Sequence, residues 1–217
     1  MPRTSRQPTS PPRRRDPDRT RTEILDVATH EFAERGFSGA RVDEIAARTE
    51  TTKRMIYYYF ESKEQLYTAV LERCYATIRL AENAVDVDGL GPVEAIRRLA
   101  ELTFDHHEAH PEFIRLVAVE NIHRAEHMAG ARHLAELNQP VIRLITTILE
   151  RGYADGAFRR EIDAVDLHMM ISSFCFFRVA NSHTFKTLFG RDPLDPAYRG
   201  RYREMVGDMV VAYLSAR

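Results

Sequence analysis

The amino-acid sequence predicts an all-α protein of about nine helices. Apolar residues recur three and four positions apart along most of the 217 residues, which is the period of an amphipathic helix. Glycines and prolines, ten of each, separate these periodic segments. No segment alternates apolar and polar residues in the manner of a half-buried strand. Three short helices followed by longer ones predict a small amino-terminal domain and a larger helical body.

Composition and charge narrow the class of protein. Hydrophobic residues make up 44% of the sequence, and no apolar run is long enough to span a membrane. The early arginines precede no apolar run, so we expect neither a signal peptide nor a membrane partner. Cys74 and Cys175 predict two small buried side chains in a reducing cytoplasm rather than a disulfide framework. The net charge is −1, but the amino-terminal part is basic and the remainder acidic, as expected when one end meets phosphate.

Residues 1–17 are predicted to form a disordered basic arm. This segment contains five prolines and five arginines, and it lacks a large aliphatic side chain after Met1. Its cluster of Arg13, Arg14 and Arg15 suits either contact with a nucleic-acid backbone or groove, or a solvated tail. A capping box at residues 20–23 predicts that the first helix begins at Thr20, and Gly36 predicts its end.

Residues 42–63 predict two short helices around a tight turn. In the first helix Val42, Ile45, Ala46 and Thr49 share one face, which gives a stripe for a core. In the second helix Thr52 can cap the amino end. This is the layout that places a helix in the major groove of DNA.

The second of these helices separates an apolar face from a polar one. Ile56 and Phe60 point inward, whereas the residues on the opposite face are Arg54, Tyr57 and Tyr58. Arginine can pair bidentately with guanine, and threonine and tyrosine hydroxyls can reach phosphates. The alternative is a helical hairpin whose tyrosines only lie at the surface.

Residues 20–71 resemble the amino-terminal part of the TetR family of bacterial regulators. The residues that carry the resemblance are Ile45-Ala46, Thr52-Lys53, Ile56-Tyr57, Tyr59-Phe60 and Ser62-Lys63-Glu64. Two positions depart from the family pattern. Glu50 stands where the family usually has glycine in the turn, and a left-handed backbone there would cost on the order of 1 kcal/mol. Arg41 lies near a position where the family often has a phosphate-binding threonine.

The resemblance implies a transcriptional regulator, a repressor that binds double-stranded operator DNA as a homodimer and is released by a small-molecule effector. It implies a helix-turn-helix domain over residues 18–63 and an effector-binding and dimerisation domain over residues 64–217. The implied DNA contacts are Arg41, Thr51, Thr52, Lys53, Arg54, Tyr57, Tyr58, Tyr59 and Lys63.

Six further helices are predicted in the larger body. A second capping box at Ser62 opens a helix towards Ala84, and the later helices are expected at 92–110, 111–128, 132–152, 163–189 and 196–216. Pro140 predicts a kink or a late start in its helix. In the family the last two long helices dimerise; here 163–189 and 196–216 are apolar enough for a four-helix interface, or for intramolecular core.

An effector cavity is expected among the helices of the body. Its predicted lining is Phe104, Phe113, Val117, Glu120, His123, Ile145, Met170, Phe174 and Phe177. Such a lining favours an apolar or aromatic effector, with Glu120 and His123 as polar anchors. Each of these residues, taken alone, is more often ordinary core.

Histidines suggest a competing class of protein. Eight of the nine lie beyond residue 100, and pairs such as His123 and His127 have metal-compatible spacing. A metal-dependent helical enzyme is therefore an alternative, but no nucleophile, base and orienting group stand out. We expect no metal, no cofactor and no enzyme activity. A protein-binding adaptor is the third hypothesis, and it gives no reason for Lys53, Arg54 and Tyr57 to face outward together.

Overall fold

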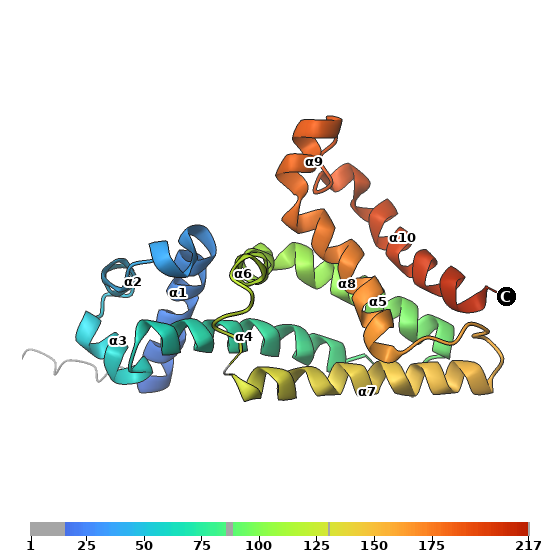
Figure 1. Ribbon diagram of the computed structural model, residues 1–217, viewed down its shortest axis with the longest axis horizontal. Helices are drawn as coiled ribbons and strands as arrows, with labels where there is room; N and C mark the ends of the chain where they lie inside the picture. Colours follow the sequence, from blue (N-terminus) through green and yellow to red (C-terminus); the bar gives the residue numbers. More distant parts are fainter. Residues whose placement is uncertain (1–15, 86–88, 130, 217) are drawn as a thin grey trace, which may run out of the picture.

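The computed structural model describes residues 16–85, 89–129 and 131–216, and this part of the chain forms ten α-helices without a strand (Figure 1). The helices are α1 (Pro17–Gly39), α2 (Val42–Arg48), α3 (Lys53–Phe60), α4 (Lys63–Asn83), α5 (Pro92–Ala109), α6 (Pro111–Ile122), α7 (Arg132–Ala154), α8 (Ala164–Ala180), α9 (Ser182–Phe189) and α10 (Pro196–Ser215). The predicted all-α class is confirmed. We call α1–α3 the head and α5–α10 the body.

Helix α1 begins earlier than the sequence predicted. The Asp16 side chain accepts a hydrogen bond from the Asp18 backbone N–H at 3.1 Å, and Pro17 occupies the first turn, where its missing N–H is not needed. The capping box at Thr20 is therefore not the helix start, and the predicted arm of residues 1–17 extends too far. Its arginine cluster, residues 13–15, lies outside the described residues. Gly36 interrupts the helix with φ 65°, close to the predicted end.

The head has one apolar core beneath its three helices. Ile24 and Phe32 from α1 meet Ile45 from α2 and Ile56 from α3, and all four are fully buried. Leu116 and Leu134 of the body complete this core. The stripes predicted from helical spacing are therefore the faces that pack.

Helix α4 is a rod shared by the two parts. Ser62 accepts a hydrogen bond from the Gln65 N–H at 3.1 Å, which confirms Ser62 as the N-cap of this helix. The first half of α4 adds Leu66 and Val70 to the head core, and the helix then runs beside α7 under the body (Figure 1). The predicted domain boundary between residues 63 and 64 stays a prediction. It falls at the start of α4, and this helix packs both on the head and on the body.

Two of the helices predicted for the body, 111–128 and 163–189, have other bounds in the structure, and Pro140 does not delay the start of a third. Helix α6 ends at Ile122 instead of 128, and the chain then turns through Arg124 and Ala125, whose φ angles are 58° and 57°. Helix α7 begins at Arg132 and continues through Pro140, so the late start is wrong.

The predicted helix 163–189 is two helices. The Ser182 hydroxyl donates to the Val179 carbonyl at 3.0 Å, and Asn181 leaves the helical conformation between α8 and α9. Side chains of this kind compete for backbone hydrogen bonds and interrupt helices. This break raises the number of helices from the predicted nine to ten.

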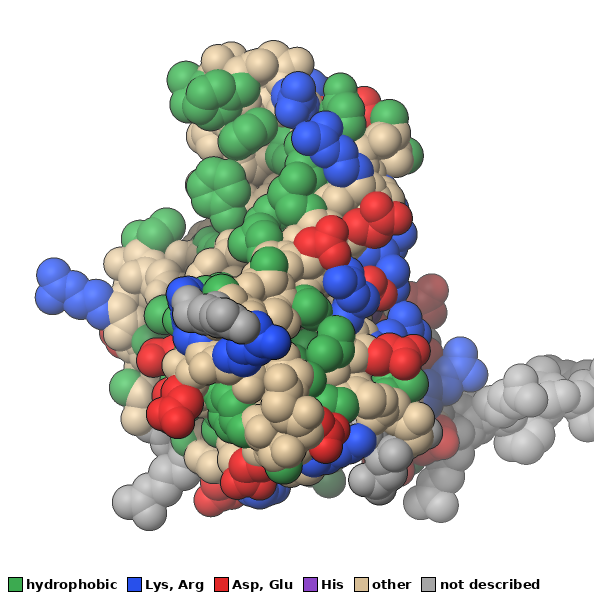
Figure 2. Space-filling model, turned by 90° about the vertical axis from the view of Figure 1, so that its right-hand side faces the viewer, with side chains coloured by type: hydrophobic (Ala, Val, Ile, Leu, Met, Phe, Trp, Pro, Cys, Tyr) green, Lys and Arg blue, Asp and Glu red, His purple; other side chains and the backbone are tan. Residues whose placement is uncertain are grey.

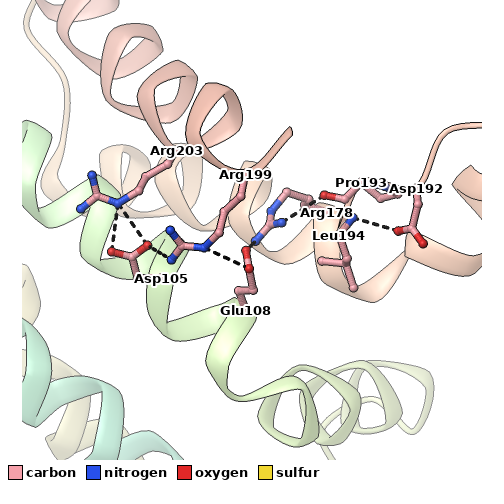
Figure 3. Close-up of polar contacts among 8 residues, drawn as sticks. All are labelled: Asp105, Glu108, Arg178, Asp192, Pro193, Leu194, Arg199 and Arg203. Carbon is pink, nitrogen blue, oxygen red and sulfur yellow. Dashed lines mark hydrogen bonds and ion pairs between the residues drawn. The ribbon is translucent and has the colours of Figure 1, made fainter. Parts of the chain in front are cut away.

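Helix α10 packs on α5, and a network of ion pairs joins the two helices (Figure 3). Asp105 accepts from Arg199 at 2.7 Å and from Arg203 at 3.0 Å, while Glu108 accepts from Arg199 at 3.1 Å and also from Arg178. The network therefore joins α5, α8 and α10 at one end of the body.

Candidate functional site

The outer face of α3 is polar and exposed, as the spacing predicted. Ile56 and Phe60 are buried, whereas Arg54, Tyr57 and Tyr58 are exposed, Tyr58 to 76%. Thr52 caps the helix by accepting from the Met55 N–H at 3.2 Å. The helix therefore presents guanidinium and phenol groups from a rigid, capped support, which is the chemistry that reads base edges and phosphates.

The turn before α3 is held in the geometry expected for glycine. Glu50 has φ 49°, which confirms the left-handed backbone, and the Thr51 N–H donates to the Ala46 carbonyl at 3.1 Å. This closes α2 with the six-residue hydrogen bond of a Schellman motif. A non-glycine residue there costs on the order of 1 kcal/mol, so the packing of the head maintains this turn against a local strain.

The other predicted DNA contacts fall into two groups. Arg41 and Lys53 are exposed, although Lys53 Nζ lies 3.2 Å from Asp43 Oδ1. Thr51, Tyr59 and Lys63 are half-buried, and Lys63 Nζ lies 4.8 Å from the Phe37 ring centre. Because an exposed ion pair is worth little, Lys53 remains able to turn towards a phosphate.

Glu31 supports this surface from inside the head, a role that the sequence analysis did not predict. Its side chain is 1% exposed, and its Oε1 accepts from the Arg41 backbone N–H at 3.2 Å. Arg35 and Arg48 approach its carboxylate at 3.5 and 3.6 Å. Glu31 thus fixes the start of α2 to α1 through contacts that are distant in the sequence.

Glu120, predicted as a polar anchor for an effector, contacts residues that join the body to the head. Its Oε1 accepts from the Tyr67 hydroxyl at 2.9 Å and lies 3.0 Å from His127 Nδ1. The His127 ring in turn packs 4.2 Å from the Phe37 ring. His123, the other predicted polar anchor, is exposed at the end of α6, so the partner of Glu120 is His127 instead.

The remaining predicted effector residues differ in burial, and their role stays a prediction. Phe104 and Ile145 are fully buried core, and Phe177 is 52% exposed. Val117, Met170 and Phe174 are half-buried. Phe113 lines a cavity of about 370 Å³ between α1, α4, α5 and α6 in the described part of the chain. A second cavity, of about 650 Å³, lies where α4 leads into α5.

A buried polar cluster lies where α4 meets α5. It consists of Arg79, Glu82, His106 and His107, each no more than 7% exposed. Arg79 Nη1 lies 2.7 Å from Glu82 Oε2, yet within the described structure both Glu82 oxygens and the Arg79 Nε lack a hydrogen bond of good geometry. Burial lowers the pKa of His106 to about 4 and that of His107 to about 3, so both rings are uncharged at neutral pH. The charged pair at positions 79 and 82 of α4 was the sequence signal for this cluster, and it was missed.

Among the residues that the structure describes, no group of three or more His, Cys, Asp or Glu side chains is arranged to hold a metal ion. No described helix is long and apolar enough to cross a membrane.

A capped polar helix, presented behind a left-handed turn on a three-helix head, defines a helix-turn-helix DNA-binding protein. The chain belongs to the TetR family. Residues 24–70 match the model of bacterial regulatory proteins of the tetR family, and residues 92–210 match the model of the tetracyclin repressor-like, C-terminal domain.

Two curated relatives have similar lengths. The HTH-type transcriptional repressor NicS of Pseudomonas putida is 34% identical over 194 residues, which cover 89% of this chain and 92% of that protein. The HTH-type transcriptional repressor SCO4008 of Streptomyces coelicolor is 30% identical over 178 residues, covering 81% and 86%. The prediction of a regulator rather than an enzyme is confirmed by these relatives, and they give no support to the metal-dependent alternative.

Solved structures show the same fold at lower identity. The ketosteroid transcriptional regulator KstR2 of Mycobacterium tuberculosis superposes with a TM-score of 0.68 at 19% identity, covering 91% of this chain and 95% of that one. A regulatory protein of the tetR family from Rhodococcus RHA1 also has a TM-score of 0.68, at 21% identity and 88% and 96% coverage.

Proposed function

We propose that this protein represses transcription by binding operator DNA as a homodimer, with α3 of each subunit in a major groove. The observation that carries the proposal is the exposed face of α3, where Arg54, Tyr57 and Tyr58 stand together beside the Thr52 cap. If the two heads enter successive grooves, the half-sites lie about 34–36 Å apart. Such a repressor acts where the bacterial chromosome lies, in the cytoplasm.

Exposed apolar side chains support a dimer through α8, α9 and α10. Figure 2 shows hydrophobic side chains gathered over the upper part of the body, where α9 lies. The exposed large apolar residues of these helices are Val165, Met169, Phe177, Leu188, Phe189 and Met209. An exposed patch of this kind marks an association surface more often than a solvated one. It agrees with the predicted pairing through residues 163–189 and 196–216.

A small-molecule effector would release the operator by preferring the non-binding arrangement of the two heads. A ligand with equal affinity for both arrangements would shift nothing. We infer an effector with an apolar or aromatic part, as the sequence predicted.

The test begins with selection of genomic DNA fragments by the purified protein, which yields an operator. Affinity for that fragment is then measured by fluorescence anisotropy. Lys53→Ala and Tyr57→Ala should each weaken binding by roughly 1–3 kcal/mol, because each removes a contact to phosphate or base. Arg143→Ala is the matched control, since Arg143 is an exposed side chain on α7 in the body.

Dimer mass, measured by light scattering, should be unchanged in all three variants. If Lys53→Ala and Tyr57→Ala bind the operator as tightly as the control, α3 is not the recognition helix.

A further inference from the structure

The cavity of about 370 Å³ lies at the junction of head and body. Helix α1 of the head forms one wall, and α4, α5 and α6 form the others. The lining residues that matter here are Thr29, His30, Cys74, His106, Glu112 and Phe113. A molecule in this space would touch both parts of the protein at once.

His106 offers this cavity an unpartnered buried polar group. It is 7% exposed, it lines the cavity, and neither ring nitrogen has a hydrogen-bond partner in the described structure. Burial lowers the pKa of His106 to about 4, so at neutral pH one ring nitrogen carries a free lone pair. A buried acceptor of this kind calls for a donor from water or a ligand.

The fixed charges around the cavity leave a carboxylate only weakly compensated. Arg73 is matched, because its Nη1 lies 2.8 Å from Asp26 Oδ1 and its Nη2 donates to Thr29 Oγ1 at 3.2 Å. Glu112 has His30 Nδ1 at 3.4 Å, longer than an ordinary hydrogen bond. Among the charged lining residues, the excess is therefore negative and lies at Glu112.

Phe113 and Cys74 give the cavity an apolar part of its wall. Phe113 is 6% exposed, and its ring centre lies 5.9 Å from that of His106 and 5.1 Å from that of Tyr75. Burial raises the pKa of the Cys74 thiol to about 11, which keeps it neutral. An aromatic ring would find apolar contacts here, and its attached cation would face an acceptor and a carboxylate.

The geometry points to a binding site for a small protonated aromatic amine at the head–body junction. The ammonium group donates to the Glu112 carboxylate and to the free ring nitrogen of His106, while the aromatic ring packs on Phe113. The cavity volume lies within the range of small-molecule sites, about 300–1,000 Å³. This site is separate from the residues predicted for the body, apart from Phe113.

Binding is tested by calorimetry on the full-length protein with benzylamine hydrochloride, benzyl alcohol and sodium benzoate. These probes share a ring and differ in charge. Benzylamine should bind at least about tenfold more tightly than benzyl alcohol, and benzoate should bind least tightly. Equal affinity for benzyl alcohol, or tighter binding of benzoate, would overturn the assignment.

Variants locate the site. Glu112→Gln keeps the shape and removes the charge, and His106→Phe keeps a ring and removes the acceptor; each should weaken benzylamine binding about tenfold. Glu136→Gln is the matched control, because Glu136 also stands near a histidine, with His133 Nδ1 at 3.8 Å, but on an exposed helix face. Circular dichroism verifies that each variant is folded. Benzylamine binding that survives both cavity substitutions would place the amine elsewhere and refute the site.

We expect benzylamine to affect DNA binding, because the cavity is lined by α1, which packs on the other helices of the head. This expectation rests on the proposed function. Saturating benzylamine should change the operator Kd measured by anisotropy, and the change should be lost in Glu112→Gln. If the protein binds no genomic fragment, the proposed repressor function fails while calorimetry still decides the site. If it binds operator but not benzylamine, the site fails and the repressor stands.

Discussion

The outer face of α3 and the second half of α4 place their charged residues in opposite ways. On α3 the charged and phenolic groups face solvent over an apolar core, with Arg54 and Tyr58 outside and Ile56 inside. In the second half of α4, Arg79 and Glu82 are buried side by side among helices that pack on each other. Helix α3 therefore presents a polar surface that can meet a partner, whereas the second half of α4 contains buried polar atoms that have no hydrogen-bond partner in the described structure.

Removing one member of the buried pair should have the largest effect. Arg79→Met should destabilise the protein by about 3–5 kcal/mol, because it leaves Glu82 buried without its counter-ion. The double variant Arg79→Met/Glu82→Leu should lose much less. Urea unfolding followed by circular dichroism measures both. Arg19→Met, which breaks an exposed pair in the head at 2.9 Å, is the control and should change little.

The same pair predicts a pH dependence. Burial raises the pKa of Glu82 to about 7 from its ordinary 4.5, so the folded state holds this proton more tightly than the unfolded state. Stability from this group is therefore gained as pH falls towards 4.5 and lost as pH rises through about 7. The deficit of Arg79→Met should be smaller at about pH 5 than at about pH 8. A deficit that grows on acidification would contradict the assignment.

Removing the hydrogen bond between Tyr67 of α4 and Glu120 of α6 should have an intermediate effect on stability. Tyr67→Phe removes the hydroxyl that donates to Glu120 and should cost about 1–3 kcal/mol of stability. Operator affinity should fall as well, since Tyr67 lies on the first turns of α4 next to Lys63. Tyr58→Phe is the comparison, because that hydroxyl belongs to an exposed side chain and its loss should leave stability unchanged. Equal stability of the two variants would show that the hydrogen bond between Tyr67 and Glu120 does not stabilise the protein.

The smallest change concerns the turn of the head. Glu50→Gly should alter stability by less than about 1 kcal/mol, because relief of the left-handed strain is partly offset by the greater freedom of glycine in the unfolded chain. The opposite kind of substitution, Gly190→Ala at a glycine with φ 66°, should destabilise the protein by about 1 kcal/mol. Thermal unfolding of the two variants measures both changes in stability. A large loss from Glu50→Gly would mean that the glutamate side chain has contacts that matter more than the backbone.

The sequence predicted the head well because its determinants are local. The caps at Thr52 and Ser62 and the stripe of Ile45 and Ala46 depend on neighbours within a turn or two. Glu31 and Glu120 could not be predicted, since their partners are brought together only by folding. The same reason applies to the cavity lining, where helical spacing identified buried faces and could not say which of them pack without a gap.

Helix boundaries failed where a polar side chain or an unusual backbone competes with the helix. The Ser182 hydroxyl interrupts the segment predicted as one helix, and the left-handed residues Arg124 and Ala125 end α6 early. Pro140 had the opposite outcome, because α7 continues through it. Packing of α7 along α4 therefore outweighs the local preference at that proline.

The shared rod α4 bears on how heads can be exchanged among relatives of this chain. In a chimera joined between residues 63 and 64, the foreign head would come without its own α4 residues. It would pack instead on the native side chains that complete the head core in this protein: Leu66, Tyr67, Val70 and Leu71. The core of the foreign head would then have to pack against four side chains that fit the core of the native head. A join placed after Leu71 keeps those four side chains with their own head, so that Leu116 and Leu134 are the remaining core residues that the body supplies.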